Sequence, residues 1–398
     1  MKNILLITPL YPLPTKENNC TYVCHYFTRE WVKMGYNVIV IHTQPVYCWL
    51  WHQLVRYFGR QIKNWAGGGN FYARKIKETE HYVMDGVPVY RIPVYNFLPH
   101  GRYPQKSVDN LAKEVFTILK NKRFTPDIIT GHALPLEIIP AINCKYSAKT
   151  CMVEHGVLYK VRERYPNYRE LIDSYDLWGF RNKSNKMEVE KNFGVLKHTF
   201  YCLSGIPACY ITDGSPRNFK TSLSRFLFIG ELIERKYPSV LLDAIPRACT
   251  GDYSITFIGE GPERSKMESI IAEKHIEGNV VFTGKIARDK IVNYLDDSEC
   301  FVMISRGEAY GLVYLEAMAR GCLVIASRDE GFDGIIVHGE NGFLCESGDS
   351  SELSAIISQI NKMSPDRRKQ IAINGLKTAQ KMTDVLVAKD YIKELEKL

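Results

Sequence analysis

Two glutamates, eight positions apart, are the residues whose type and spacing most clearly indicate chemistry. Glu308 and Glu316 lie in the stretch SRGEAYGLVYLEAMARG at 305–321, the first in a predicted loop and the second in a predicted buried helix. Acidic side chains are almost never fully buried without a partner. Each carboxylate should therefore be satisfied either by another group of the protein or by a bound ligand.

The helix predicted to begin near Gly311 offers one answer. The free backbone N–H groups of Gly311, Leu312 and Val313 would point outward at the positive end of the helix dipole, which suits a phosphate. Glu316, one to two turns further on, could accept hydrogen bonds from two ribose hydroxyls, and Glu308 would lie beyond the phosphate. The alternative is a helix N-terminal charge plus a glutamate paired inside the domain. Spacing alone slightly favours this alternative.

Strands and helices alternate in both halves of the chain, which predicts parallel sheets covered on both faces. The expected strands are short β-branched or aromatic runs at 3–8, 36–43, 126–133, 149–156, 198–204, 225–231, 253–261, 279–284, 300–305, 322–327 and 342–346. The two halves join near 211–224. The pattern therefore predicts an α/β protein of two Rossmann-like domains.

Ligands of open parallel sheets bind at the carboxyl ends of the strands. One predicted strand ends in FIGEG, with Gly259 and Gly261 in the turn that follows. This GxG lacks the remainder of a GxGxxG pattern, and glycines are common in tight turns. The local pattern alone therefore favours a structural role over a cofactor role.

The composition argues against several classes of protein. Hydrophobic residues make up 45% and charged residues 24% of the 398, an ordinary globular balance. No apolar run approaches the roughly 20 residues of a spanning helix, and the eleven cysteines form no CxxC pair. We expect reduced thiols and a cytoplasmic protein. The net charge of +8 is concentrated in the first 220 residues, which predicts an anionic partner or surface, but no nucleic-acid-binding motif is present.

The run E-A-Y-G-L-V-Y-L-E at 308–316 resembles the E-x7-E motif of retaining GT-B glycosyltransferases of the group 1, or family-four, class. The likeness is looser in the first half, where it covers the first strand–helix–strand unit, VEHG at 153–156 and SGIPACYITDGSPRNF at 204–219. It is specific over about residues 225–350, where further runs follow the family's order: FLFIGELIERK, ITFIGEGPERSKME, VVFTGKIARDKIVNYLDDSECFVMIS, EAMARGCLVIAS and VHGENGFLCESGD.

The resemblance implies a GT-B fold, in which two Rossmann-like domains with parallel sheets face a cleft and close on a nucleoside-diphosphate sugar. Residues 1–220 would bind the acceptor, residues 221–380 would bind the donor, and a helix within 381–398 would return to the first domain. The sugar would be transferred with retention by front-face attack, without a protein-bound intermediate. Such chemistry needs positive charge on the leaving diphosphate, together with positioning of the reactants.

Carried onto this sequence, the family's motifs assign residues to three roles. The catalytic residues would be Glu308, His155 and Lys236. The residues that bind the donor would be Glu316, Gly311, Leu312, Val313, Gly230, Arg235, Gly259, Gly261, Gly284 and Lys285. The residues on the acceptor side would be Asn19, Cys20 and Thr21. No metal or cofactor is expected, because no His/Asp cluster has ligand spacing. The expected partners are the nucleotide-sugar donor and a glycan or lipid-linked acceptor of surface-polysaccharide assembly.

The sequence departs from the family pattern in three places. Glu231 stands where the family has an arginine, and a carboxylate repels a pyrophosphate unless a residue such as Arg235 substitutes. Cys20 stands where glycine is common. The run DEGFDGII at 329–336 replaces a pair of glycines and displaces a glutamate, although Gly331 and Gly334 keep some of that freedom.

His155 ends the predicted strand that carries VEHG. A lone histidine at a strand end is more often structural than catalytic. The family has a functional histidine at this place near the sugar. The resemblance therefore favours a role for His155 in binding the donor sugar or positioning the acceptor.

The segment 46–65 combines bulky apolar residues at roughly helical spacing with basic residues and no acidic one. The apolar positions are Trp49, Trp51, Leu54, Val55, Phe58, Ile62 and Trp65. One interpretation is an interfacial helix on an anionic membrane, which would place the protein peripherally on the inner face of the plasma membrane. The other, equally favoured, is a helix that packs its apolar face on the first domain.

Two other classes of function remain open. One is a nucleotide-sugar-binding protein that has lost catalysis, an alternative that Glu231 supports. The other is a sugar phosphorylase or a nucleotide-sugar epimerase on the same fold. Analysis of products formed from labelled donor sugars distinguishes these alternatives from a glycosyltransferase.

Overall fold

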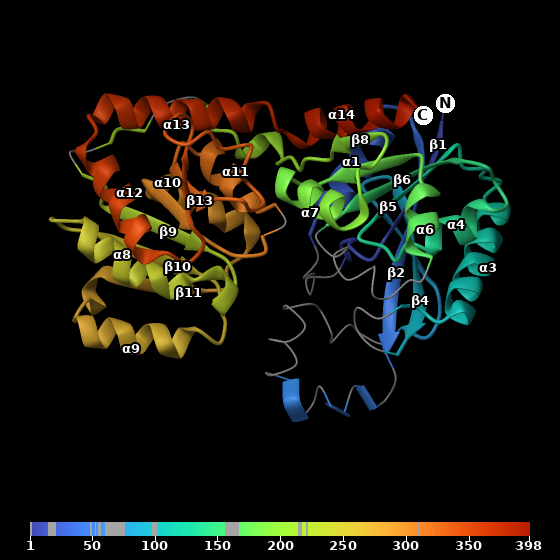
Figure 1. Ribbon diagram of the computed structural model, residues 1–398, viewed down its shortest axis with the longest axis horizontal. Helices are drawn as coiled ribbons and strands as arrows, with labels where there is room; N and C mark the ends of the chain where they lie inside the picture. The colour runs from blue at the N-terminus through green and yellow to red at the C-terminus, as the bar shows by residue number, and fades with distance from the viewer. Residues whose placement is uncertain are drawn as a thin grey trace. The chain divides into compact units, whose positions relative to one another are not determined.

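The computed structural model describes residues 2–14, 21–47, 50–51, 53–54, 57–59, 76–97, 102–155, 167–213, 217–219, 222–308 and 310–398. Figure 1 shows the elements along the chain. The chain divides into two compact units. Unit 1 comprises Met1–Phe180, Met187–Cys202 and Val387–Leu398, and unit 2 comprises Arg181–Lys186 and Leu203–Leu386.

Unit 1 is built on an eight-stranded sheet with the order β3-β4-β2-β1-β5-β6-β7-β8. All neighbouring strands are parallel except β3 and β4. The strands are β1 (Asn3–Thr8), β2 (Asn37–Tyr47), β3 (Glu80–Met84), β4 (Val87–Asn96), β5 (Ile128–His132), β6 (Lys149–Glu154), β7 (Leu177–Phe180) and β8 (Thr199–Tyr201). The central strands β1 and β5 are buried almost throughout, as expected for a parallel sheet covered on both faces.

The described helices of unit 1 connect these strands and cover the sheet. They are α1 (Val23–Lys33), α3 (Gln105–Asn121), α4 (Ile138–Asn143), α6 (Tyr168–Asp173) and α7 (Lys183–Phe193), of which α7 begins in unit 2. In α3, residues such as Val108, Leu111 and Val115 recur at three- and four-residue spacing and are buried. This apolar stripe packs the helix on the core of the unit.

Unit 2 has a six-stranded parallel sheet with the order β11-β10-β9-β12-β13-β14. The strands are β9 (Arg225–Ile229), β10 (Ser254–Ile258), β11 (Val280–Gly284), β12 (Cys300–Met303), β13 (Leu323–Ser327) and β14 (Phe343–Cys345). The helices are α8 (Leu241–Ala248), α9 (Arg264–Lys274), α10 (Ile291–Asp297), α11 (Leu312–Ala319), α12 (Ser350–Lys362) and α13 (Pro365–Gln380). Strand order reverses between β9 and β12, which makes their carboxyl ends the switch point where ligands bind in such sheets.

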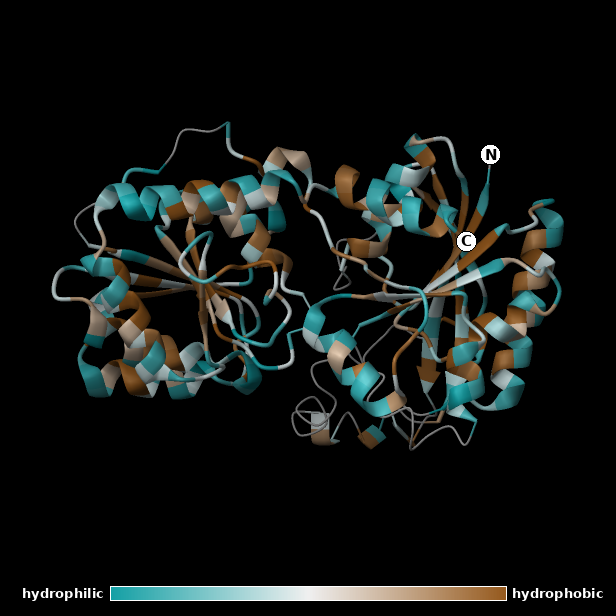
Figure 2. Cartoon of the chain, turned by 45° about the horizontal axis from the view of Figure 1, so that its top comes forward, coloured by the Kyte–Doolittle hydropathy of each residue, from teal (hydrophilic) through white to brown (hydrophobic). Residues whose placement is uncertain are grey.

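Figure 2 shows the same layering in each unit, with hydrophobic residues along the strands and hydrophilic residues on many outer helix positions. The phenylalanines of β9 and β10, including Phe226, Phe228 and Phe257, are buried, as are the apolar residues of β12. The strands predicted from β-branched and aromatic runs therefore contribute to the core of unit 2.

The long segment of unit 2 begins at Leu203, before the predicted boundary at 220/221. Ile206 forms a bridge with Thr383, and the Tyr310 hydroxyl donates a hydrogen bond to the Ser204 carbonyl over 2.7 Å. These contacts attach residues 203–213 to unit 2. Their partners are distant in the sequence, which is why local pattern placed the boundary later.

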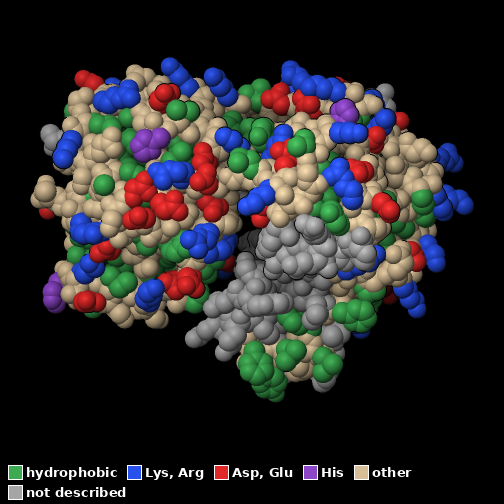
Figure 3. All heavy atoms as spheres, viewed as in Figure 1, with side chains coloured by type: hydrophobic (Ala, Val, Ile, Leu, Met, Phe, Trp, Pro, Cys, Tyr) green, Lys and Arg blue, Asp and Glu red, His purple; other side chains and the backbone are tan. Residues whose placement is uncertain are grey.

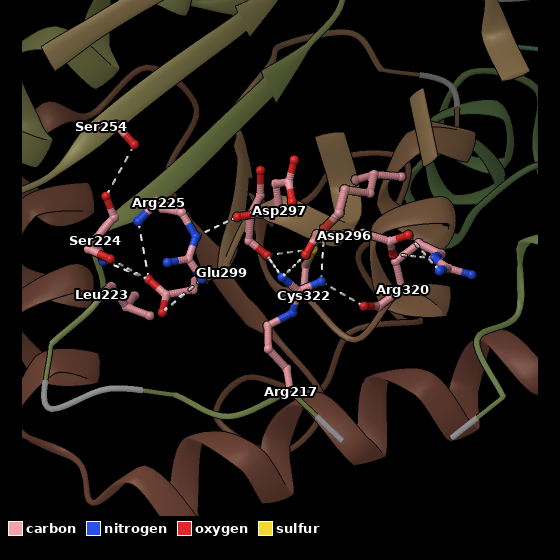
Figure 4. A network of polar contacts seen from close by, with 12 residues as sticks. Arg217, Leu223, Ser224, Arg225, Ser254, Asp296, Asp297, Glu299, Arg320 and Cys322 are labelled. Carbon is pink, nitrogen blue, oxygen red and sulfur yellow. Dashed lines mark hydrogen bonds and ion pairs between the residues drawn. The ribbon is translucent and has the colours of Figure 1, made fainter. Parts of the chain in front are cut away.

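Arg217 attaches the next part of this connection (Figure 4). Its guanidinium donates to the carbonyl oxygens of Leu295 and Asp296, both over 2.8 Å, and also to that of Ser298. It further donates to the Arg320 carbonyl over 2.9 Å. One side chain thus satisfies carbonyl groups at the ends of α10 and α11.

Helix α14 (Asp384–Glu396) begins in unit 2, but from Val387 onward it belongs to unit 1. There the Trp31 indole N–H donates to the Ala388 carbonyl over 3.0 Å. The Tyr391 hydroxyl lies 2.5 Å from Thr130 Oγ1, within the core of unit 1. The C-terminal helix is therefore an integral part of the first unit.

The segment 46–65 differs in part from the expected amphipathic helix. It begins within β2, and Trp51 is buried, with its ring centroid 6.2 Å from that of Tyr47. At this position the structure agrees with the second interpretation, in which the segment packs on the protein. Trp49, Val55, Ile62 and Trp65 lie outside the described residues.

Several described side chains of the same segment are nevertheless exposed, among them Leu50, Leu54, Tyr57 and Phe58. Figure 3 shows a group of hydrophobic side chains at the lower edge of the view. Within the described part of the chain, no helix is long and apolar enough to cross a membrane.

Candidate active site

Three charged side chains meet beyond the adjacent ends of β9 and β12. Lys236 and Arg235 lie in a short 3₁₀ turn after β9, and Glu308 lies in the loop after β12. Glu308 Oε2 is 3.8 Å from Lys236 Nζ and 4.0 Å from Arg235 Nη1. Lys236 and Glu308 are both 16% exposed. The switch point of the sheet therefore carries two cations and one carboxylate from neighbouring strands.

Gly230 makes this arrangement possible. A Cβ at residue 230 would lie 2.9 Å from Lys236 Nζ, so a larger side chain would displace the ammonium group. At Gly259, φ is +141° and a Cβ would lie 1.9 Å from the Gly230 carbonyl oxygen. Close packing of the turns after β9 and β10 accounts for both glycines.

The other predicted donor-site glycines have different surroundings. A Cβ at Gly261 would lie 2.2 Å from the Leu232 carbonyl oxygen, which again indicates close backbone packing. Gly284 ends β11 at the edge of the sheet, and Lys285 after it is exposed. Because β11 is two strands from β9, Lys285 follows a strand about 10 Å from β9.

Gly311 is the N-cap of α11, with φ of +77°, and Leu312 and Val313 form its first turn. A Cβ at residue 311 would meet the Tyr314 ring at 2.4 Å, so glycine is required there. No described side chain caps this helix end. Its first N–H groups are therefore oriented as an anion site at the carboxyl edge of the sheet.

Glu316 is buried and forms an ion pair with Arg288, a residue that the sequence analysis did not select. The Arg288 side chain is 37% exposed, and its Nε lies 3.4 Å from the Tyr210 hydroxyl. Glu316 is paired with another residue of the protein, as in the alternative that spacing slightly favoured. The only sequence signal for the partner was its place among the basic residues of KIARDK.

Glu330 is a second residue that the sequence analysis did not assign to the site. Its carboxylate accepts the Glu308 backbone N–H over 2.8 Å. Burial raises the pKa of Glu330, and the charge of Glu308 raises it further, against the opposing effect of the N–H groups of Gly307 and Glu308. The sequence signal was the departure at 329–336, where this displaced glutamate occurs.

Glu231 is exposed, and no ion pair with it is found among the described residues. Arg235 is directed to Glu308 instead, and its Nη1 lies 3.4 Å from the Arg306 carbonyl and 3.5 Å from that of Gly307. Among the described residues, Arg235 is therefore paired with Glu308 and not with Glu231. Arg235 is the cation that accompanies Lys236 at the switch point.

In unit 1, His155 follows β6 and is half-buried. Its Nε2 lies 3.1 Å from His132 Nδ1, and His132 Nε2 lies 3.2 Å from the Tyr391 hydroxyl. On the predicted acceptor side, Thr21 Oγ accepts the Val23 N–H over 3.4 Å. Asn19 and Cys20 lie outside the described residues.

The described residues contain no group of three or more His, Cys, Asp or Glu side chains that could hold a metal ion. The charged side chains of the cluster offer electrostatic chemistry. Lys236 and Arg235 can stabilise an anion, and Glu308 and Glu316 can accept hydroxyl hydrogen bonds.

Residues 215–378 match the family described as "Glycosyl transferases group 1". The segment 215–378 is therefore similar to the group 1 glycosyltransferases. The match covers most of unit 2, including every strand and helix that carries the charged cluster. The matched segment thus carries the charged cluster at the strand ends described above.

Curated relatives match different shares of the chain. N-acetyl-alpha-D-glucosaminyl L-malate synthase of Bacillus anthracis is 36% identical over 28% of this chain and 29% of its own length. A lipopolysaccharide core biosynthesis glycosyltransferase of Rhizobium meliloti is 33% identical over 33% of this chain and 38% of its own. An uncharacterized glycosyltransferase of Methanocaldococcus jannaschii is 28% identical over 71% of this chain and 70% of its own length. The chain thus spans about a third of the length of the Bacillus anthracis and Rhizobium meliloti relatives.

Solved structures resemble the whole chain. Sucrose-phosphate synthase from Thermosynechococcus elongatus has a TM-score of 0.72 at 15% identity, covering 100% of this chain and 99% of its own. Anabaena HepE in complex with UDP has a TM-score of 0.68 at 16% identity, covering 100% of both chains. At such low identity the likeness shows the fold, which is GT-B.

Proposed function

We propose that this protein transfers a sugar from a nucleoside-diphosphate sugar to a glycan or lipid-linked glycan of surface-polysaccharide assembly, with retention of configuration. The observation that carries the proposal is the cluster of Lys236, Arg235 and Glu308 at the switch point of a group 1 donor domain. The Rhizobium meliloti relative is described as a glycosyltransferase of lipopolysaccharide core biosynthesis, which supports a glycan or lipid-linked glycan as the acceptor.

In the proposed reaction, the diphosphate would bind at the N-terminus of α11, near Leu312 and Val313, and Lys236 and Arg235 would neutralise it. The bond from the sugar C1 to the diphosphate oxygen breaks, and the acceptor oxygen attacks from the same face. The acceptor proton passes to the departing phosphate oxygen. Catalysis would come from preorganised positive charge and from positioning.

The two glutamates would bind hydroxyl groups on either side of that diphosphate. Glu308 would accept from the donor sugar, and Glu316 from the ribose once Arg288 has moved away. His155 would position the donor sugar or the acceptor. Ion pairs with a partly exposed arginine are worth only about 1 kcal/mol, so a ribose with two hydroxyls can compete for Glu316.

A second candidate function is binding of a nucleotide sugar without catalysis. Glu231 favours it, because an exposed carboxylate stands where the family supplies an arginine. Incubation with labelled donor sugars separates the candidates. A transferase gives a glycosylated acceptor, a phosphorylase gives a sugar phosphate, an epimerase gives an altered donor, and a binding protein gives none of these.

The donor is best identified first, by a thermal-shift screen of UDP-, GDP-, ADP- and CMP-sugars. A ligand at 100 times its dissociation constant should raise the free energy of unfolding by about 2.7 kcal/mol. The donor that stabilises the protein is then used, labelled, in the product analysis. Absence of stabilisation by every nucleotide sugar would contradict the proposal.

We further propose that residues 46–65 contact an anionic membrane surface, where a lipid-linked acceptor would be found. The support is the exposure of Leu54, Tyr57 and Phe58 in a segment rich in basic residues. Burial of Trp51 limits the contact surface to the part of the segment beyond it.

A further inference from the structure

The loop between β12 and α11, which carries Glu308, is fixed at its start by neighbouring strands. The Ser305 carbonyl accepts a hydrogen bond from the Ser327 hydroxyl, at the end of β13, over 2.6 Å. It also accepts one from the Ser347 hydroxyl, shortly after β14, over 3.0 Å. Side chains from two other strand ends therefore hold the first residue of the loop in place.

At Glu308 itself, the loop is held by Glu330, which lies in the turn after β13. Glu330 Oε2 accepts the Glu308 backbone N–H over 2.8 Å, and the Gly307 N–H stabilises the same carboxylate. The turn comes very close to the loop, because a Cβ at Gly331 would lie 2.6 Å from the Glu308 carbonyl oxygen. Glycine at 331 therefore allows Glu330 to reach the backbone of the loop.

The side chain of Glu308 is held less firmly than its backbone. Its Oε2 lies 3.8 Å from Lys236 Nζ and 4.0 Å from Arg235 Nη1, which is longer than a hydrogen bond. The same oxygen is buried and has no hydrogen-bond partner among the described residues. The two cations therefore attract the carboxylate without fixing its direction, whereas the bond from Glu330 fixes the backbone that carries it.

We propose that Glu330 is a positioning residue that holds the backbone of Glu308 and so directs its carboxylate to the donor sugar. The inference rests on the proposed function, in which Glu308 binds that sugar. An ionised carboxylate only accepts hydrogen bonds, so Glu330 can accept from the N–H groups of both Gly307 and Glu308. Such charge-assisted bonds are roughly twice as strong as neutral ones. A neutral side chain at 330 should therefore hold the loop less firmly.

The surroundings of Glu330 make this contact sensitive to pH. Burial raises the pKa of Glu330, the N–H groups of Gly307 and Glu308 lower it, the charge of Glu308 raises it and that of Arg235 lowers it, with a net rise. Tyr314, on α11, is buried with a pKa well above its usual value, so it stays neutral. Acidification through the raised pKa of Glu330 should therefore weaken the contact.

The test follows the backbone N–H groups of Gly307 and Glu308 by NMR of the ¹⁵N-labelled full-length protein during a pH titration. An amide proton that is bonded to a carboxylate moves to lower field when the carboxylate ionises. In the wild type both protons should show a step above the usual glutamate range. Glu330→Gln should lose that step and keep only the one from Glu308 itself. Identical titration curves would overturn the proposal, whether or not the protein proves to be a transferase.

Glu352→Gln is the matched control. Glu352 Oε2, on α12, accepts the Glu346 N–H over 2.6 Å, so here too a glutamate holds the backbone of another glutamate. The variant should change the titration of the Glu346 N–H and leave those of Gly307 and Glu308 unchanged. A change at Gly307 and Glu308 as large as that in Glu330→Gln would refute a specific contact.

Once a donor and an acceptor are known, kinetics test the positioning role. Glu330→Ala should lower kcat by about tenfold or more, because misplacement by about 1 Å can cost on the order of 100-fold. Affinity for the bare nucleoside diphosphate should not fall. Glu330→Gln keeps an acceptor oxygen and should recover part of the rate. An unchanged kcat in Glu330→Ala, or no recovery in Glu330→Gln, would contradict the proposal.

Two further measurements separate positioning from a general effect on the fold. In a Glu308→Ala background, Glu330→Ala should have no further effect on kcat. The kcat of the wild type should fall on acidification through the raised pKa of Glu330, and this step should be absent in Glu330→Gln. Additive losses, or the same pH profile in both enzymes, would show that Glu330 does not act through Glu308.

Discussion

At the scale of single residues, the site is organised by charge compensation. Glu308 lies near Lys236 and Arg235, and Glu316 is paired with Arg288. Glu308 Oε2 is buried and accepts no hydrogen bond among the described residues, so a hydroxyl donor placed there would remove an energetic cost. Both carboxylates proposed to bind sugar hydroxyls thus lie next to cationic side chains.

The first prediction separates the two glutamates. Glu316→Ala should weaken binding of the bare nucleoside diphosphate, because hydrogen bonds to a charged acceptor are worth about 1.5–3 kcal/mol each. Glu308→Ala should leave that affinity nearly unchanged and lower turnover. Titration calorimetry and rate measurements test both. Arg288→Ala is the control: if Arg288 only occupies the ribose site, nucleotide affinity should stay or rise by up to about 1 kcal/mol.

The second prediction concerns the departure at Glu231. Glu231→Arg should tighten donor binding or raise the rate, because a cation would replace an exposed carboxylate near the diphosphate. Glu231→Gln, which only removes the negative charge, should give a smaller gain. Donor affinity and kcat measure the effect. An unchanged or slower Glu231→Arg enzyme would mean that Glu231 does not face the phosphates.

The third prediction uses the raised pKa of Glu330. Between its unfolded pKa of about 4.3 and the raised folded value, the folded protein binds more protons than the unfolded chain, so stability falls as pH rises through that window. Glu330→Gln removes this contribution. Urea denaturation should therefore show a larger gain in free energy of unfolding from about pH 4 to about pH 7 in the variant than in the wild type.

Glu352→Gln provides a control of opposite sign. Although burial opposes it, hydrogen bonds from the Glu346 N–H and Arg328 hold the pKa of Glu352 below its usual value. That carboxylate contributes stability above its unfolded pKa, and the contribution is lost on acidification. The gain from pH 4 to pH 7 should be smaller in Glu352→Gln. Equal pH dependence of Glu330→Gln and the wild type would contradict the prediction.

At the scale of elements, β9 and β12 are joined at the ends opposite to the site (Figure 4). Glu299, directly before β12, is fully buried. Its Oε2 accepts the backbone N–H groups of Ser224 and Arg225 over 2.8 and 3.2 Å, and the Ser224 hydroxyl over 3.0 Å. One carboxylate thus fixes the relative position of the two strands that carry Lys236 and Glu308.

The fourth prediction follows from this contact. Glu299→Ala should lower the free energy of unfolding by about 3–5 kcal/mol, because buried donors and Arg225 would lose their acceptor. Glu299→Gln keeps an acceptor oxygen and should cost clearly less. Chemical denaturation measures both. Where the folded variants remain populated, nucleotide affinity should change little; a loss of affinity without a loss of stability would contradict the structural role.

At the scale of the whole molecule, the basic first half and the exposed apolar residues of 46–65 bear on where the enzyme works. The described portion supplies no membrane-spanning helix. A surface contact would combine apolar insertion with attraction of about 1 kcal/mol per basic residue near an anionic surface. Salt should weaken that attraction.

The fifth prediction tests this surface. Wild-type protein should sediment with liposomes that contain anionic lipid and much less with neutral ones. The double variant Tyr57→Ser/Phe58→Ser should lose sedimentation without losing thermal stability, because both side chains are exposed. Trp51→Ala, at a buried position, should instead cost about 3–5 kcal/mol of stability. Failure of the wild-type protein to sediment with anionic liposomes would contradict the proposed membrane contact.

The sequence by itself determined most of the elements and the family motif, but β3, β4 and β7 were not among the expected strands. Runs such as RFLFIGE and CFVMIS specify buried parallel strands, and the spacing from Glu308 to Glu316 places both around the N-terminus of α11. These features depend on near neighbours in the chain. Periodicity and turn residues therefore suffice to predict them.

Only the tertiary structure decided which partner each charge has. Arg288 pairs with Glu316, Glu330 binds the Glu308 N–H, and Tyr391 reaches His132 from the far end of the chain. Burial of Trp51 and the start of unit 2 at Leu203 also depend on contacts between distant segments. Such pairings are set by which strand ends and helix faces meet on folding, and no local spacing in the sequence encodes that meeting.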